Sequence, residues 1–131
     1  MGGIVGLLRL DRKPVEPSQL EKMSATIEHR GSDGISTHLK DNIGFCCLHR
    51  HITPESSLEP GFYSELSDRY VVLFHGRIDN RLELYQAIGY DRSLTEVPDS
   101  ALVLAAYHKW QEGCAEKIIG DFSFTIWDSI E

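Results

Sequence analysis

The fold class is decided by Phe122-Ser123-Phe124-Thr125-Ile126-Trp127, close to the end of the chain. Large apolar residues recur at every second position of this stretch, and that period predicts a β-strand. Trp127 falls on the face opposite to Phe124 and Ile126, so both faces of the strand are expected to be covered at least in part. A sheet covered in this way belongs to a layered protein.

Three other segments predict strands, because they are short and rich in apolar, aromatic or β-branched residues: 4–10, 43–52 and 70–74. The dense turn signal at 31–34 comes before the second of them. Residues 53–67 are polar and contain proline, and we expect a loop there.

Three amphipathic segments predict helices. One covers 18–30, after Pro17, and Gly31 is a plausible stop. A second follows the capping pair Asp79-Asn80 and ends at Gly89. A third lies over 102–110, with Asp99 where an N-cap is expected. Strands and amphipathic helices together predict an α+β fold with a mainly antiparallel sheet.

Length and charge narrow the class of protein. The chain has 131 residues, enough for one domain, and a formal net charge of −7. An acidic surface repels nucleic acid and anionic lipid, so we expect small molecules or proteins as partners, and neither nucleic acid nor a membrane. The three cysteines form no CxxC pair, which indicates reduced, buried thiols and a cytoplasmic protein.

Four segments carry a resemblance to a known family. They span nearly the whole chain: Met1-Gly2-Gly3-Ile4-Val5-Gly6, His29-Arg30-Gly31-Ser32-Asp33-Gly34, His75-Gly76-Arg77-Ile78-Asp79-Asn80 and Gly120-Asp121-Phe122-Ser123-Phe124-Thr125-Ile126-Trp127-Asp128. In this order and at these separations they resemble the class II glutamine amidotransferase domain of asparagine synthetases. The resemblance implies an αββα N-terminal-nucleophile hydrolase sandwich over residues 1–131. We expect it to be truncated at its C-terminal end, with the synthetase domain outside this chain.

The chemistry that the resemblance implies depends on the first residue left after methionine removal. In the family a cysteine there attacks the side-chain amide of glutamine, and its free α-amine acts as the base. An asparagine side chain and the backbone N–H of the following glycine form the oxyanion hole. An arginine and an aspartate hold the α-carboxylate and the α-ammonium of glutamine.

Transferred to this chain, the family pattern is kept only in part. The nucleophile position is Gly2, which has no side chain, and the oxyanion-hole asparagine corresponds to His75, followed by Gly76. Arg50 matches the carboxylate-binding arginine, and Asp99 matches the ammonium-binding aspartate. The glutamine-binding positions implied as a set are Arg50, Ile52, Gly76, Arg77 and Asp99.

Several of these residues have simpler interpretations. Arg50 could be an arginine at a strand edge, and Asp99 could be only an N-cap, worth about 1 kcal/mol. His49 and His51 share one face of a strand, but the sequence offers no third ligand for a metal site. Cys46 and Cys47 lack a free α-amine, and strand alternation directs at least one of them into the core.

Residues 53–57 and 76–80 look most similar to asparagine-synthetase-like proteins of peptide tailoring, such as lasso-peptide cyclases and β-lactam synthetases. In that group an amine of the substrate replaces ammonia, so loss of the nucleophile is compatible with function. The implied reaction activates a carboxylate with ATP. We expect no cofactor in this chain, with ATP and magnesium only on the absent synthetase domain, because the chain has no phosphate loop.

Three functional hypotheses follow. The first is a glutaminase-deficient amidotransferase domain that serves a synthetase domain, in cis or in trans, as a structural or interaction module. The second is a glutamine-hydrolysing enzyme in which Gly2 is an engineered or misread cysteine. The third is a non-catalytic module that binds glutamine or a related amino acid through Arg50 and Asp99. An open strand edge could also pair with another copy of the chain, which would give a homo-oligomer.

Overall fold

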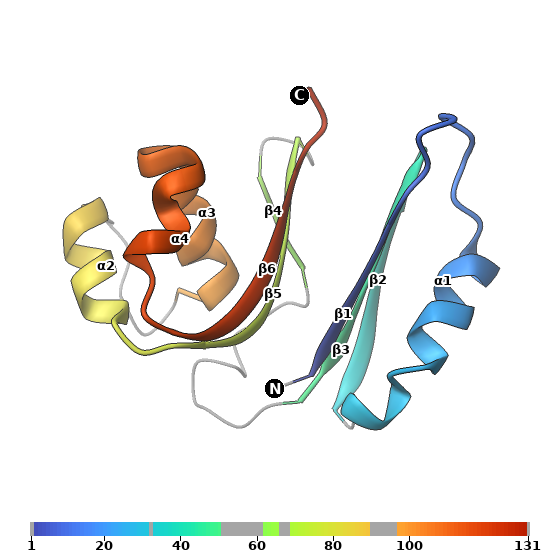
Figure 1. Cartoon of the computed structure of the whole chain (residues 1–131), viewed down its shortest axis with the longest axis horizontal. Coiled ribbons are helices and arrows are strands. Elements are labelled where there is room, and N and C mark those ends of the chain that lie inside the picture. The colour runs from blue at the N-terminus through green and yellow to red at the C-terminus, as the bar shows by residue number, and fades with distance from the viewer. Residues whose placement is uncertain (1, 32, 51–61, 66–68, 90–96, 131) are drawn as a thin grey trace.

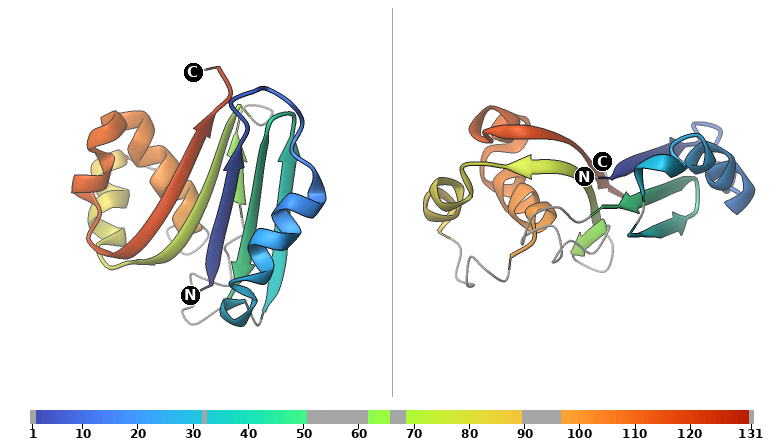
Figure 2. Two further views of the ribbon diagram at one scale, coloured as in Figure 1. Left: turned by 45° about the vertical axis from the view of Figure 1, so that its right-hand side comes forward. Right: turned by 90° about the horizontal axis from the view of Figure 1, so that it is seen from below.

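The computed structural model describes residues 2–31, 33–50, 62–65, 69–89 and 97–130. They form four layers: one helical layer, two three-stranded sheets and a second helical layer (Figures 1 and 2). The expected α+β fold and αββα sandwich are confirmed. Among the described residues no helix is long and apolar enough to cross a membrane.

The first sheet contains β1 (Gly3–Leu8), β2 (Gly34–Lys40) and β3 (Ile43–His49) in the order β1-β3-β2. Both pairings are antiparallel, and Gly3 lies opposite Leu48 in the register of β1 and β3. The start of β1 therefore lies beside the end of β3.

The second sheet contains β4 (Phe62–Glu65), β5 (Tyr70–Ile78) and β6 (Gly120–Asp128) in the order β4-β5-β6. Its pairings are also antiparallel, and Phe74 lies opposite Phe124. The central strand β5 is buried along most of its length.

Helices cover the outer face of each sheet. Helix α1 (Pro17–Ala25) and the 3₁₀ helix η1 (Glu28–Arg30) cover the first sheet. On the second sheet lie α2 (Arg81–Ile88), α3 (Asp99–Trp110), η4 (Gln111–Gly113) and α4 (Cys114–Lys117) (Figure 1).

Strand alternation divides the apolar residues among three clusters. In β3, Phe45 and Cys47 face the second sheet, where they pack with Val71 and Leu73 of β5. The intervening Cys46 and Leu48 face the opposite way and join the cluster beneath α1. Both faces of β3 are thus buried, which accounts for its nearly continuous apolar sequence.

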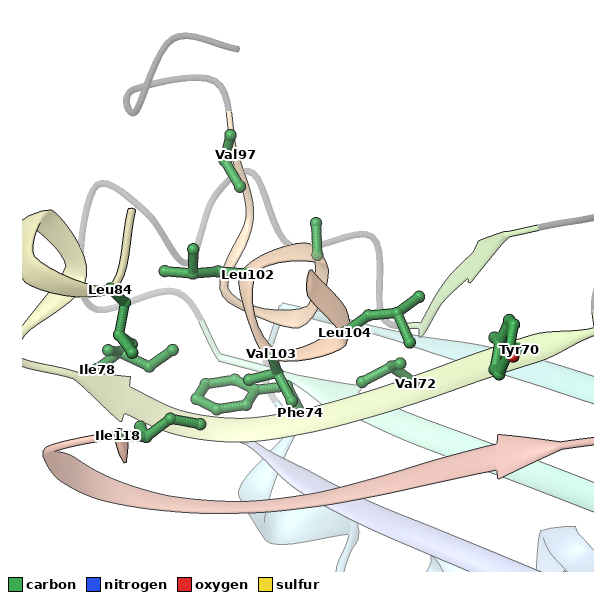
Figure 3. Packing of buried hydrophobic residues seen from close by; sticks show 11 residues of the cluster. Tyr70, Val72, Phe74, Ile78, Leu84, Val97, Leu102, Val103, Leu104 and Ile118 are labelled. Carbon is green, nitrogen blue, oxygen red and sulfur yellow. The ribbon is translucent and has the colours of Figure 1, made fainter. Parts of the chain in front are cut away.

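The largest cluster lies between β5 and α3. Val72 and Phe74 point from β5 toward Leu102, Val103 and Leu104 of α3 (Figure 3). The three α3 side chains are fully buried. Helix α3 is therefore the element that anchors the second helical layer.

Two strands were not predicted, and one helix is shorter than expected. β2 follows the turn predicted at 31–34, in residues for which the sequence predicted no element. β4 lies within the loop predicted over 53–67. The helix predicted over 18–30 ends at Ala25. Thr26 Oγ1 donates a hydrogen bond to the Met23 carbonyl at 2.7 Å, and such local bonds compete with helix continuation.

The predicted caps are confirmed only in part. Gly89 ends α2 in a left-handed conformation, φ 76°, as expected. Asn80 occupies the N-cap position of α2, but its side chain bonds to Lys117 and Ile119 instead of to the helix. The N-cap role of Asp99 was wrong: Pro98 holds that position and Asp99 is already the first residue of α3.

Candidate functional site

Gly2, the expected nucleophile position, is buried immediately before β1. A Cβ on residue 2 would overlap the Leu48 carbonyl oxygen and lie 2.6 Å from the carbonyl carbon. It would also lie 3.3 Å from the backbone nitrogen of Arg50. The space that a cysteine side chain needs is therefore taken by the backbone of β3.

Two neighbouring glycines allow the same close packing. A Cβ on Gly3 would lie 2.8 Å from Ile27 Cδ1, and one on Gly31 would lie 2.5 Å from Leu48 Cβ. Arg30, in η1, donates a hydrogen bond from Nε to the Gly2 carbonyl at 3.1 Å. The start of β1 is thus held between the end of β3 and η1.

His75 and Gly76, the two expected oxyanion-hole positions, lie in β5 opposite Ser123 and Phe122 of β6. Gly76 has φ 131°, and a Cβ there would overlap the Asp121 carbonyl oxygen. Only glycine fits this position without strain. The close contact with β6 therefore explains why residue 76 is glycine, whether or not its N–H stabilises an oxyanion.

His75 lies within electrostatic reach of Gly2 and Arg30. Burial lowers its pKa below the ordinary value, and the positive charge of Arg30 lowers it further. Asp121 and the Gly2 backbone act in the opposite direction. Among the described residues His75 Nε2 is buried without a hydrogen-bond partner, while Nδ1 lies 3.5 Å from Ser123 Oγ. A neutral imidazole is the form that this setting favours.

An NMR titration is expected to give His75 a pKa below the 6.5 of an unperturbed histidine. Replacing Arg30 by glutamine should raise that pKa, because a repelling charge is removed. Since the unfolded chain binds the proton more tightly, the stability contributed by neutral His75 is complete above pH 6.5 and is lost as the pH falls toward the folded pKa. A His75 pKa above 6.5 would contradict the arrangement.

Two of the expected glutamine-binding positions lie near the end of β5 or directly after β3. Arg50 follows β3 and is exposed, with its backbone close to Gly2. Arg77 is exposed and its Nε lies 2.6 Å from Asp79 Oδ1, an ion pair that raises the pKa of Arg77. Ile52 lies outside the described residues, as does His51.

Asp99, another expected glutamine-binding position, is only 6% exposed at the start of α3. Its Oδ1 is paired with Nη1 of Arg81, whose Nη2 donates to the Val97 carbonyl at 2.6 Å. Arg81 was missed by the sequence analysis. Its partner is 18 residues away on another helix, and no local pattern indicates such a pair.

Comparison with known proteins identifies the family. The glutamine amidotransferase domain family matches residues 1–131. This chain belongs to that family. Relatives of this amidotransferase domain include glutamine-hydrolysing asparagine synthetases 3 and 1 of Bacillus subtilis (strain 168), which are 24% and 29% identical to it. Each match covers 98% of this chain and 21% of the relative, so the chain spans about a fifth of the length of these proteins.

Within the amidotransferase domain, the described contacts bring Gly2, Arg30, the Arg50 backbone and His75 together where β1 begins and β3 ends. Gly76 adjoins this group along β5. The ion pair of Asp99 with Arg81 instead joins α3 to α2. Part of the predicted set therefore lies around Gly2, whereas Asp99 is tied to the helical layer.

The cysteines of this amidotransferase domain are buried: Cys46, Cys47 and Cys114. Burial raises the pKa of the Cys114 thiol, so it is a poor nucleophile. His49 Nε2 lies 2.7 Å from Ser36 Oγ. In the part of the chain that the structure describes, no three His, Cys, Asp or Glu residues gather as metal ligands.

Proposed function

We propose that this glutamine amidotransferase domain is glutaminase-deficient and belongs to an asparagine-synthetase-like, ATP-dependent amide-forming protein. In that protein it serves as a structural or interaction module. The observation that carries the proposal is the packing of Gly2 against Leu48. Residue 2 has no thiol, and its surroundings leave no room for one.

Hydrolysis of glutamine by this family's chemistry needs a nucleophile that attacks the side-chain amide carbon and releases ammonia. A free α-amine at Gly2 could act as a base. Glycine, however, has no side-chain nucleophile whose proton this amine could accept. The Arg30 hydrogen bond fixes the backbone of residue 2, which carries no reactive side-chain atom.

The oxyanion-hole positions support the same proposal. The side chain of His75 is longer than that of asparagine, so its N–H donor lies at a different position. A neutral imidazole also carries only one N–H. Gly76 is tied to β6 by its contact with Asp121. We infer that the remaining role of these two residues is to hold β5 against β6 beside the start of β1.

The proposed glutamine-binding positions have unequal support. Arg50 is exposed and its backbone is close to Gly2, which suits a carboxylate ligand. Asp99 is buried and paired with Arg81, which favours a structural role over binding of an ammonium group. This weighs against the hypothesis of an amino-acid-binding module that uses both residues.

A misread or engineered cysteine at position 2 is also less well supported. A cysteine there would force β1 away from β3, whereas a chain that retained the enzyme's geometry would leave room for the side chain. The narrower assignment to peptide tailoring rests on residues 53–57 and 76–80 and on the reaction type, in which a substrate amine replaces ammonia. ATP and magnesium would then be bound by residues outside this chain.

The experiment measures glutamate and ammonia released from ¹⁵N-labelled glutamine by the purified chain. We expect no release above that of buffer, at any pH between 6 and 9 and with the initiator methionine removed or retained. A heat-unfolded sample provides the background, and a native sample must show an intact fold by circular dichroism. Repeated turnover by the folded, unmodified chain would refute the proposal.

A further inference from the structure

A serine and a histidine that play no part in the arrangement around Gly2 form a close hydrogen bond on the first sheet. Ser36 Oγ, in β2, lies 2.7 Å from His49 Nε2, at the end of β3. Both residues are half-buried. A hydroxyl within about 2.6–3.2 Å of an imidazole nitrogen is the arrangement in which the imidazole can act as the base for a serine nucleophile.

The strand register places this pair on the inner face of the sheet. Ser36 lies opposite Cys47, and His49 is two positions beyond Cys47 in β3. Directly opposed side chains share one face of a sheet, as do side chains two positions apart along a strand. Cys47 packs toward the second sheet, so Ser36 and His49 also face the second sheet. Gly34 lies opposite His49 and places no side chain against the imidazole.

A second histidine lies on the same face, two residues further along β2. The ring of His38 lies beside those of Phe45 and Phe62, with ring centroids 6.4 and 5.1 Å away. His38 Nε2 is buried, and among the residues that the structure describes it has no hydrogen-bond partner. Buried polar atoms in folded proteins nearly always have a partner. His38 therefore offers a hydrogen bond that the described protein groups do not use.

We propose that Ser36, His49 and His38 form an acyl-transfer site for activated esters. Ser36 Oγ attacks the carbonyl carbon of the ester, its proton passes to His49 Nε2, and the Nε2–H of His38 donates a hydrogen bond to the developing oxyanion. The bond to the leaving alcohol then breaks, and the alcohol takes the proton from His49. Water next attacks the acyl-serine and gives a proton to His49. The acid is released, and Ser36 regains its proton from His49.

The substrate class follows from the leaving group and from the spacing of the side chains. A phenol or an acidic alcohol leaves with little help from an acid, whereas the nitrogen of an amide must first be protonated. Residues 36 and 38 are about 6–7 Å apart along the strand, which leaves room for one carbonyl group between the two side chains. Glutamine is a primary amide and lies outside this class. The proposed activity is therefore separate from the glutaminase chemistry expected at Gly2.

Covalent labelling of the whole chain with a fluorophosphonate, located by peptide mass spectrometry, tests the proposal. An activated serine forms a bond from Oγ to phosphorus and releases fluoride. We expect the label on Ser36 of the folded chain and none on Ser36 after heat unfolding, which separates the serine from His49. The matched control is Thr37→Ala, which removes the neighbouring, exposed hydroxyl on the opposite face of β2. This control is expected to leave the labelling of Ser36 unchanged.

Hydrolysis of p-nitrophenyl acetate provides a second measurement, with the heat-unfolded chain as the background. Above that background, we expect Ser36→Ala and His49→Gln to lower turnover by at least about 100-fold. His38→Phe keeps an aromatic ring and removes the N–H, and we expect it to lower turnover by about 10²–10³-fold. Circular dichroism checks that each variant is folded. An unlabelled Ser36 in the folded chain, equal labelling of the unfolded chain, or unchanged turnover by Ser36→Ala would overturn the proposal.

Discussion

Replacing Arg81 by alanine is expected to lower the free energy of unfolding by about 3–5 kcal/mol. Arg81 and Asp99 form an ion pair in which the side chains are only 11% and 8% exposed. Removing the cation leaves a buried carboxylate without its counter-charge, and it also removes the hydrogen bond to the Val97 carbonyl. Urea denaturation followed by circular dichroism measures the loss.

The matched control is Arg77→Ala, which removes the exposed ion pair to Asp79. Solvent screens that pair, so its loss should leave the urea midpoint almost unchanged. If the two variants lose the same stability, Arg81 and Asp99 do not form the buried pair that joins α2 to α3. The comparison also tests whether Asp99 has a structural role in this ion pair or a role in binding a ligand.

Replacing Gly2 by alanine is expected to destabilise the chain by about 2–3 kcal/mol, because one added methyl group overpacks a filled site. The Cβ would overlap the Leu48 carbonyl oxygen, which belongs to β3 and cannot turn aside as a flexible side chain could. The start of β1 must therefore move. Thermal unfolding of the variant beside the unmodified chain measures the loss.

Gly113→Ala is the control for that substitution. Gly113 has φ −68°, and a Cβ there would have nothing within 4 Å. Alanine at such a position is expected to be neutral or to stabilise by about 0.4–1 kcal/mol, because it restricts the unfolded chain. Equal melting temperatures for the Gly2 and Gly113 variants would show that residue 2 has room for a side chain.

The sequence predicted the strands that carry strong apolar patterns. β3, β5 and β6 were recognised because their apolar residues are frequent and β-branched or aromatic. β2 was missed because five of its seven residues are exposed and its sequence is mixed in polarity. β4 has only four residues, none of them buried. Tertiary pairing, and not local pattern, makes these two segments strands.

The sequence selected candidate positions for a site, but it did not predict how they pack. Motifs marked Gly2, His75 and Gly76, and the structure brings these three positions to one end of the sheets. The close approach of Gly2 to Leu48 was not predictable, since it depends on the register of β1 and β3. The pair of Arg81 with Asp99 was equally hidden, because it arises from how α2 and α3 pack.

We propose that this amidotransferase domain has neither the nucleophile nor the space for it. Glutamate release by a methionine-processed Gly2→Cys variant tests this proposal, because that variant restores the reactive atom. We expect no release above that of the unmodified chain, together with a lowered melting temperature. Steady glutamate production by a Gly2→Cys variant that is as stable as the unmodified chain would contradict it.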